Sequence, residues 1–107
     1  MEQLHILYIG RHPEIKETVV RLLNNNEQWT GAGACTDEEA LAAWSQHAFD
    51  IVLLGSGIEE ENEQKLSNFF RQENPRIIII RHYGGGSGLL TGEIMQALDN
   101  NRLSLPV

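Results

Sequence analysis

The sequence predicts a single α/β domain in which a parallel sheet carries helices on both faces. Four short apolar runs are typical of strands, and each is followed by a segment with helical periodicity. The strongest of these runs are apolar throughout instead of alternating with polar residues. Strands of that kind are typical of a parallel sheet that is covered on both faces, and right-handed crossovers leave few topologies for it. The 107 residues suit one domain with one core.

The first strand is predicted at residues 4–9 and the first helix from Pro13 onward. Residues 4–9 are short, apolar and rich in β-branched and aromatic side chains, and Gly10 ends the run. Proline suits the first turn of a helix, and three asparagines at residues 24–26 end the periodic segment. Its buried side is expected to comprise Ile15, Val19, Leu22 and Leu23.

The second strand is predicted at residues 29–35 and is weaker, because Gly31 and Gly33 interrupt it. A strand of this kind suits a sheet edge, where packing demands are lower. Thr36 and Glu39 have the spacing of a capping box, so a helix is expected to begin there. Its core-facing stripe is expected to comprise Ala40, Leu41, Trp44 and Ala48.

The alternation continues through the second half of the chain. Residues 50–54 and 77–80 are predicted as the third and fourth strands, the latter from a run of isoleucines. Phe69 and Phe70 mark the helix between them, which must stop before Pro75. We expect both phenylalanines and Trp44 to lie in the core. A glycine loop at residues 84–88, a last helix and an apolar tail at residues 103–107 complete the chain, and the tail is a candidate fifth strand.

Composition excludes several classes of function. The net charge is -7, and Lys16 and Lys65 are the only lysines. We therefore do not expect a basic surface that binds nucleic acid or an anionic membrane. No apolar run approaches the roughly 20 residues of a membrane span, and the N-terminus lacks the features of a secretory signal. The single cysteine, Cys35, forms no internal disulfide, which suggests the cytoplasm, and we expect it to be a small buried side chain. The four acids within residues 59–63 are expected to be solvated.

The order and spacing of these segments resemble the receiver domain of two-component response regulators. Residues 6–9 followed by His12 and Pro13 are similar to the first strand and helix entry of that family. Residues 36–41 are similar to the start of its second helix, and residues 49–54 to the strand that leads to its phosphorylation site. The resemblance covers nearly the whole chain, and residues 1–107 are expected to form a single receiver-like domain. It implies a flavodoxin-like (CheY-like) doubly wound sheet of four to five strands in the order 2-1-3-4(-5), with the last strand and helix curtailed.

Every position that carries the chemistry of that family is changed in this chain. Gly10 and Arg11 stand where the resemblance implies the acidic pair that holds Mg²⁺, and Gly55 stands where it implies the phosphoaccepting aspartate. Arg81 replaces the switch Ser or Thr, and the lysine of the family, followed by proline, has no counterpart. Glycine offers no nucleophile, and an arginine would repel Mg²⁺. The sequence therefore predicts a non-enzymatic pseudo-receiver that is not phosphorylated at Gly55 and holds no metal or cofactor.

Two hypotheses concern the altered pocket at the carboxyl ends of the strands. The positions expected to converge there are Gly10, Arg11, Gly55, Arg81 and His82. In the first, Arg11 and Arg81 bind a small anion or a nucleotide without catalysis, helped by the glycine loop. The loop residues concerned are Gly85, Gly86 and Ser87. In the simpler one, each arginine pairs with an acid of the following loop, namely Glu59, Glu60 or Glu61.

The output of such a module is expected to be contact with a protein partner of a signalling pathway, including self-association as a homodimer. The expected interaction face comprises Leu89, Leu90, Ile94 and Leu103. An enzyme is disfavoured, because no Ser-His-Asp, Cys-His or paired-carboxylate arrangement fits the predicted crevice. The four histidines lack the i, i+4 spacing of a helical metal site.

Overall fold

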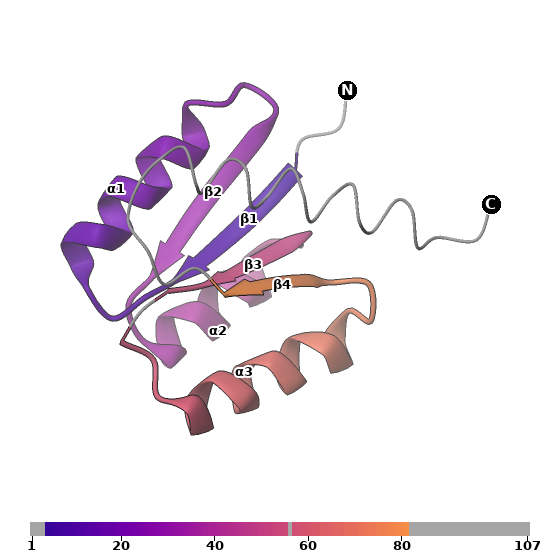
Figure 1. Ribbon diagram of the computed structural model, residues 1–107. Coiled ribbons are helices and arrows are strands. Elements are labelled where there is room, and N and C mark those ends of the chain that lie inside the picture. Colours follow the sequence, from indigo (N-terminus) through magenta and orange to yellow (C-terminus); the bar gives the residue numbers. More distant parts are fainter. Residues whose placement is uncertain (1–3, 56, 82–107) are drawn as a thin grey trace.

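The computed structural model describes residues 4–55 and 57–81, which form a parallel sheet between two layers of helices (Figure 1). The strands are β1 (Leu4–Ile9), β2 (Trp29–Ala34), β3 (Ile51–Leu54) and β4 (Ile78–Arg81). The helices are α1 (Pro13–Asn24), α2 (Asp37–Gln46) and α3 (Glu60–Glu73). The strand order is β2-β1-β3-β4, which confirms the predicted topology. The predicted fifth strand and last helix fall outside the described residues.

The two faces of the sheet are covered by different helices. Figure 1 shows α1 on one face and α2 with α3 on the other. Successive side chains of a strand point to opposite faces, so Tyr8 lies on the α1 face and Ile9 on the α2–α3 face. The buried side chains of the α1 face are Ile6, Tyr8, Val19, Leu23, Trp29, Ile51 and Leu53. Those of the opposite face are Leu7, Ile9, Ala34, Ala40, Phe49, Val52, Leu54, Leu66, Phe70 and Ile77.

The first turns of the helices contain the residues that the sequence indicated. Pro13 occupies the first helical position of α1. At α2, the Thr36 hydroxyl accepts from the Glu39 N–H (3.1 Å), which confirms the predicted capping interaction. The Glu39 carboxylate accepts in turn from the N–H of Cys35 (2.8 Å), one residue before the cap. Both bonds satisfy backbone donors at the turn into α2.

The glycines of β2 serve the close approach of α1. A Cβ at Gly31 would lie 2.7 Å from the Cβ of Leu23, and one at Gly33 would lie 2.6 Å from a methyl carbon of Val20.

Strand β2 lies at the edge of the sheet, as predicted, and a side chain of α1 bonds to its outer backbone groups at one residue. The Asn24 side chain accepts from the Gly31 N–H (2.9 Å) and donates to the Gly31 carbonyl (3.1 Å). These two bonds satisfy the outward-facing backbone groups of Gly31, which are then unavailable for pairing with another strand.

Four residues predicted to be buried are exposed. Leu41 and Phe69 are 40% and 36% exposed, and Ile15 is 41% exposed in the first turn of α1. Ala48 lies beyond the end of α2 and is exposed as well. The inward stripe of α2 is narrow, since Ala40 is its one fully buried residue, and helical periodicity does not resolve the flank of a helix from its centre. Cys35, also expected to be buried, is only partly covered.

In the part of the chain that the structure describes, no helix combines the length and the apolar character needed to cross a membrane.

Candidate functional site

The site begins where β1 and β3 end side by side. Gly10 follows β1 and Gly55 follows β3, and both are buried. The N–H of Gly10 donates to the Ala34 carbonyl (3.0 Å), and the N–H of Gly55 donates to the Ile9 carbonyl (2.7 Å). These bonds continue the sheet by one residue beyond each strand. The two glycines are therefore held in place by the sheet, as expected for positions at this edge.

The space above both glycines is filled by the side chain of Tyr8. A Cβ built at Gly10 would lie 2.5 Å from the Tyr8 hydroxyl oxygen. One built at Gly55 would overlap that oxygen and lie 2.6 Å from the Cζ of the ring. Real Cβ atoms essentially never approach another heavy atom closer than 3.0 Å. Because Tyr8 is only 2% exposed, its ring occupies the volume in which a side chain at either glycine would have to lie.

The phenol of Tyr8 stays neutral over the physiological range of pH. Burial raises the pKa of Tyr8 above the ordinary tyrosine value, and the negative charge of an ionised Cys35 would raise this pKa further. The edge of the sheet therefore carries a neutral aromatic group, and not the carboxylates that the family resemblance implies there.

The described residues do not fit a magnesium ion at this edge. Mg²⁺ is bound through carboxylate and other oxygen ligands, in near-octahedral geometry. Gly10 and Gly55 bring no side-chain oxygen, and Arg11 brings a positive charge. No group of three or more His, Cys, Asp and Glu side chains capable of holding a metal occurs among residues 4–55 and 57–81.

Arg11 turns away from β3 and toward β2. Its Nη1 donates to the Cys35 carbonyl (3.0 Å), and its Nη2 pairs with Oδ1 of Asp37 (2.6 Å). Cys35 follows β2, and Asp37 is the first residue of α2. One guanidinium group therefore ties the end of β1 to the turn between β2 and α2. The Arg11 side chain is 25% exposed, so solvent screens this ion pair only in part.

Arg81 holds a second acid, on a different helix. The Nε of Arg81 lies 2.5 Å from Oε1 of Glu63, which joins the end of β4 to the first turns of α3. The Glu63 side chain is 5% exposed, whereas that of Arg81 is 60% exposed. A buried carboxylate requires such a partner, because its desolvation is costly.

These two ion pairs correct the sequence-based expectation for the arginines. The simpler of the two hypotheses, in which each arginine pairs with Glu59, Glu60 or Glu61, is wrong: both arginines are paired, but with Asp37 and Glu63. The acidic stretch 59–63 was expected to be solvated throughout. That holds for its first three glutamates and is wrong for Glu63, which points inward because it lies one turn before the buried Leu66.

The loop after β3 lies close to the turn between β1 and α1. Gly57 has a φ of +88°, a conformation that favours glycine. A Cβ at this position would lie 3.0 Å from the Cβ of Arg11 and 3.5 Å from Nε2 of His12. The loop therefore packs against the turn that leads into α1.

The remaining residues assigned to the pocket and to the partner surface lie outside the described part of the chain. They are His82, Gly85, Gly86, Ser87, Leu89, Leu90, Ile94 and Leu103.

Sequence reasoning missed Tyr8, Asp37 and Glu63. A signal for Tyr8 was available, because Tyr8 and Gly10 are two residues apart and must share one face of β1. Asp37 was assigned to the capping segment alone, and its pairing with Arg11 spans 26 positions of sequence. A contact over that distance becomes apparent only when the neighbouring strands are assembled.

Comparison with known proteins agrees with this fold. No family model matches the chain, and no curated protein matches it. The signal receiver domain of an HD domain-containing protein from Pseudomonas fluorescens Pf-5 is 16% identical with a TM-score of 0.79, over 96% of this chain and 100% of that one. The non-phosphorylated HemR receiver domain from Leptospira biflexa is 19% identical with a TM-score of 0.64, over 98% of both chains. At these identities the likeness establishes the fold: the chain has the flavodoxin-like fold of response regulator receiver domains.

Proposed function

We propose that this chain is a non-catalytic pseudo-receiver: a signalling module that is not phosphorylated at Gly55 and that acts by contact with another protein. The observation that carries the proposal is the position of Tyr8, whose buried ring lies over Gly10 and Gly55. The solved structures that share this fold are receiver domains, which supports a role in signalling. With one cysteine in the sequence, we propose the cytoplasm as its location.

Three requirements of phosphoryl transfer to a carboxylate are unmet at this edge. The transfer needs a nucleophilic oxygen, a bound divalent cation that neutralises charge, and room for the phosphoryl group. Gly55 supplies no oxygen, and Arg11 stands where a cation would need an acid. Tyr8 fills the space next to both glycines. The missing nucleophile at Gly55 by itself prevents the reaction at this position, and the other two changes oppose it further.

The anion-binding alternative receives less support. It requires guanidinium groups that are free to take up phosphate or a carboxylate from solution. Arg11 is already bonded to Asp37 and to the Cys35 carbonyl, and Arg81 is bonded to Glu63. The two arginines also point to different helices. An anion would therefore have to break two ion pairs to bring them together.

A phosphodonor assay tests the proposal directly. The chain is incubated with acetyl phosphate or phosphoramidate in the presence and absence of Mg²⁺, with a conventional receiver domain as the positive control, and intact mass is measured. We expect no mass increase in this chain under conditions that modify the control. Metal-dependent addition of one phosphoryl group, located by peptide mapping to the loop after β3, would contradict the proposal.

A further inference from the structure

An exposed apolar surface spans the two helices that cover the same face of the sheet. Among the described residues, three large hydrophobic side chains are exposed, namely Ile15, Leu41 and Phe69. Leu41 lies three residues before Trp44 on α2, so the two are neighbours on the helix surface. Phe69 of α3 meets Trp44 edge-on at a centroid distance of 6.5 Å. Two of the three exposed side chains therefore flank one partly buried tryptophan.

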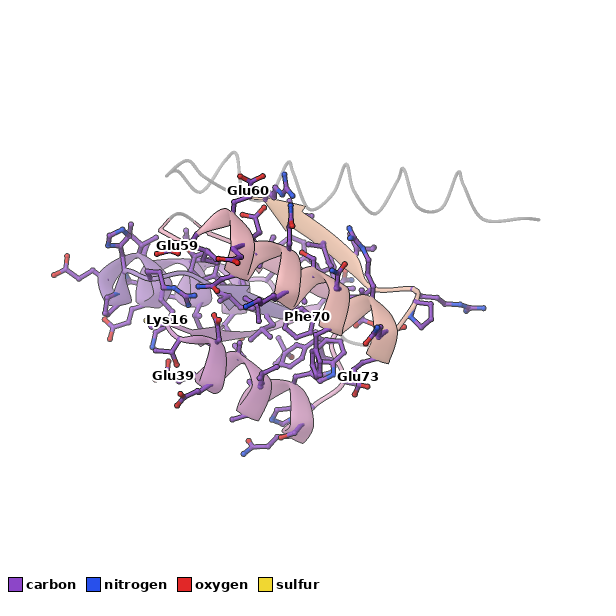
Figure 2. The ribbon with its side chains drawn as sticks, turned by 90° about the horizontal axis from the view of Figure 1, so that it is seen from below. Lys16, Glu39, Glu59, Glu60, Phe70 and Glu73 are labelled. Atoms are coloured by element: carbon purple, nitrogen blue, oxygen red, sulfur yellow. The ribbon has the colours of Figure 1, made fainter. Side chains whose placement is uncertain are left out.

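Aromatic rings bridge α2 and α3 beneath this surface. The Trp44 ring lies 4.6 Å from that of Phe70 and 6.1 Å from that of Phe49, and it stacks on the latter. Figure 2 shows Phe70 between the two helices, with Glu73 at the same end of α3. Phe70 and Phe49 are buried, so the cluster has a fixed base. The exposed part of the cluster, formed by Leu41, Trp44 and Phe69, is thereby held in place before any partner binds.

An open cavity of about 510 Å³ adjoins this exposed part at the C-terminal ends of the two helices. Trp44, His47 and Phe49 supply its aromatic wall, and Glu73 supplies a carboxylate. No Lys or Arg is found among the described residues that line it. An aromatic face beside a carboxylate is a favourable environment for the guanidinium or ammonium group of another molecule.

The charge of this layer favours a cationic partner. Helices α2 and α3 together carry seven acids and two bases, and α2 carries no base at all. Asp37 and Glu63 are paired with Arg11 and Arg81, which leaves five acids outside these ion pairs. Helix α1, on the opposite face, carries two of each. Glu39, Glu59 and Glu60 lie near the N-terminal ends of α2 and α3, whereas Glu73 lies at the opposite end of α3, beside the cavity (Figure 2). Lys65 lies one turn before Phe69, and Arg71 lines a separate pocket with Ile79 and Arg81 of β4. The cationic group of a partner therefore belongs at the Glu73 end of the groove and not beside Lys65.

We propose that the α2–α3 groove, defined by Leu41, Trp44, Phe69 and Glu73, binds a basic amphipathic segment of a partner protein. An arginine or lysine of that segment enters the cavity between Trp44 and Glu73, and an apolar side chain packs on Leu41 and Phe69. Exposed aromatic anchors beside a charged pocket are typical of the residues that dominate binding energy. The inference rests on the proposed function only in assigning the output to a protein contact.

Binding of a designed peptide tests the groove. The probe is a fluorescein-labelled helical peptide with Arg and Leu at i, i+4 spacing, and its counterpart carries Glu in place of Arg. Fluorescence anisotropy gives the affinity of the full chain, and the two indole N–H resonances report whether Trp44 is touched. Phe69→Ser and Glu73→Gln remove the apolar and the acidic contact. Ile15→Ser and Glu17→Gln on α1 are matched controls of similar exposure and equal charge change.

We expect the Arg peptide to bind and to shift the Trp44 indole resonance, while the Glu peptide does neither. Phe69→Ser and Glu73→Gln should each weaken binding about tenfold or more, and the α1 controls should leave it within about twofold. Equal losses in groove and control variants would show only non-specific attraction to an acidic protein and would overturn the proposal. A dimer of the chain alone that Phe69→Ser dissociates would assign the groove to a second copy instead. Phosphoryl incorporation does not enter these readouts, so failure here is distinguishable from failure of the proposed function.

Discussion

Replacing Gly55 by alanine tests the packing that underlies the proposed function. The new methyl group would lie 2.6 Å from the Cζ and 2.9 Å from the Cε1 of Tyr8, in addition to overlapping the hydroxyl oxygen. The ring cannot move aside freely, because Tyr8 is 2% exposed and its backbone lies in β1 between Gly33 and Leu53. Overpacking of this kind costs about 1–3 kcal/mol of unfolding free energy. For a domain of this size the melting temperature should fall by roughly 5–20 °C.

A double-mutant cycle identifies the source of that loss. Tyr8→Leu is destabilising by itself, because it empties buried volume, but it also removes the atoms that a methyl group at Gly55 would meet. The two changes together should therefore cost less than their sum, with a coupling free energy of about 1–3 kcal/mol in urea unfolding. Gly31→Ala is the matched control, since its added Cβ would meet Leu23 and not Tyr8. Additivity of Gly55→Ala and Tyr8→Leu within about 0.5 kcal/mol would refute the reasoning.

Three further outcomes are expected. Arg81→Met should lower the unfolding free energy by about 1–3 kcal/mol, because it removes the ion-pair partner of the buried acid Glu63. Adding Glu63→Gln should recover part of this loss, and a double variant that recovers none of it in chemical denaturation would contradict the reasoning. Thr36→Ala should cost about 1 kcal/mol through loss of the α2 cap, while Thr36→Ser should cost much less. The sequence has two tyrosines, so in a Tyr83→Phe variant the absorbance of an ionised phenol reports Tyr8 alone. This absorbance should appear above the ordinary tyrosine pKa of about 10. Since burial raises the pKa of Tyr8 in the folded state, its contribution to stability is present below the unfolded pKa and is lost as pH rises through the folded one; a titration with the ordinary midpoint would contradict this.

The order of elements could be predicted because each rests on a local pattern. The apolar runs of β1, β3 and β4 and the Thr36 cap of α2 are visible within a few residues of sequence. The predicted burial of residues at the edges of the helix stripes was wrong for a physical reason. Leu41 and Phe69 fit helical periodicity, but periodicity gives a direction and not the width of the buried stripe, and both lie where the gap between two helices is open.

The candidate site was predictable in its positions and not in its contacts. Gly10, Arg11, Gly55 and Arg81 could be placed at one edge from strand order alone, since parallel strands end together. The partners of the arginines could not, because pairs such as Arg11–Asp37 join segments that are far apart in sequence. The acid that each arginine pairs with depends on which carboxylate its side chain can reach once β2 and α2 have packed against β1.

Tyr8, Gly10 and Gly55 are best understood as one mutually dependent set. A carboxylate at Gly10 or Gly55 requires a smaller residue at position 8, because the phenol now occupies its place. A smaller residue at position 8 with both glycines retained would leave a cavity at the junction of β1 and β3, which is itself destabilising. A substitution at any one of the three positions alone therefore lowers stability. Building a phosphorylation site at this edge would need concerted change at all three positions, together with release of Arg11 from Asp37.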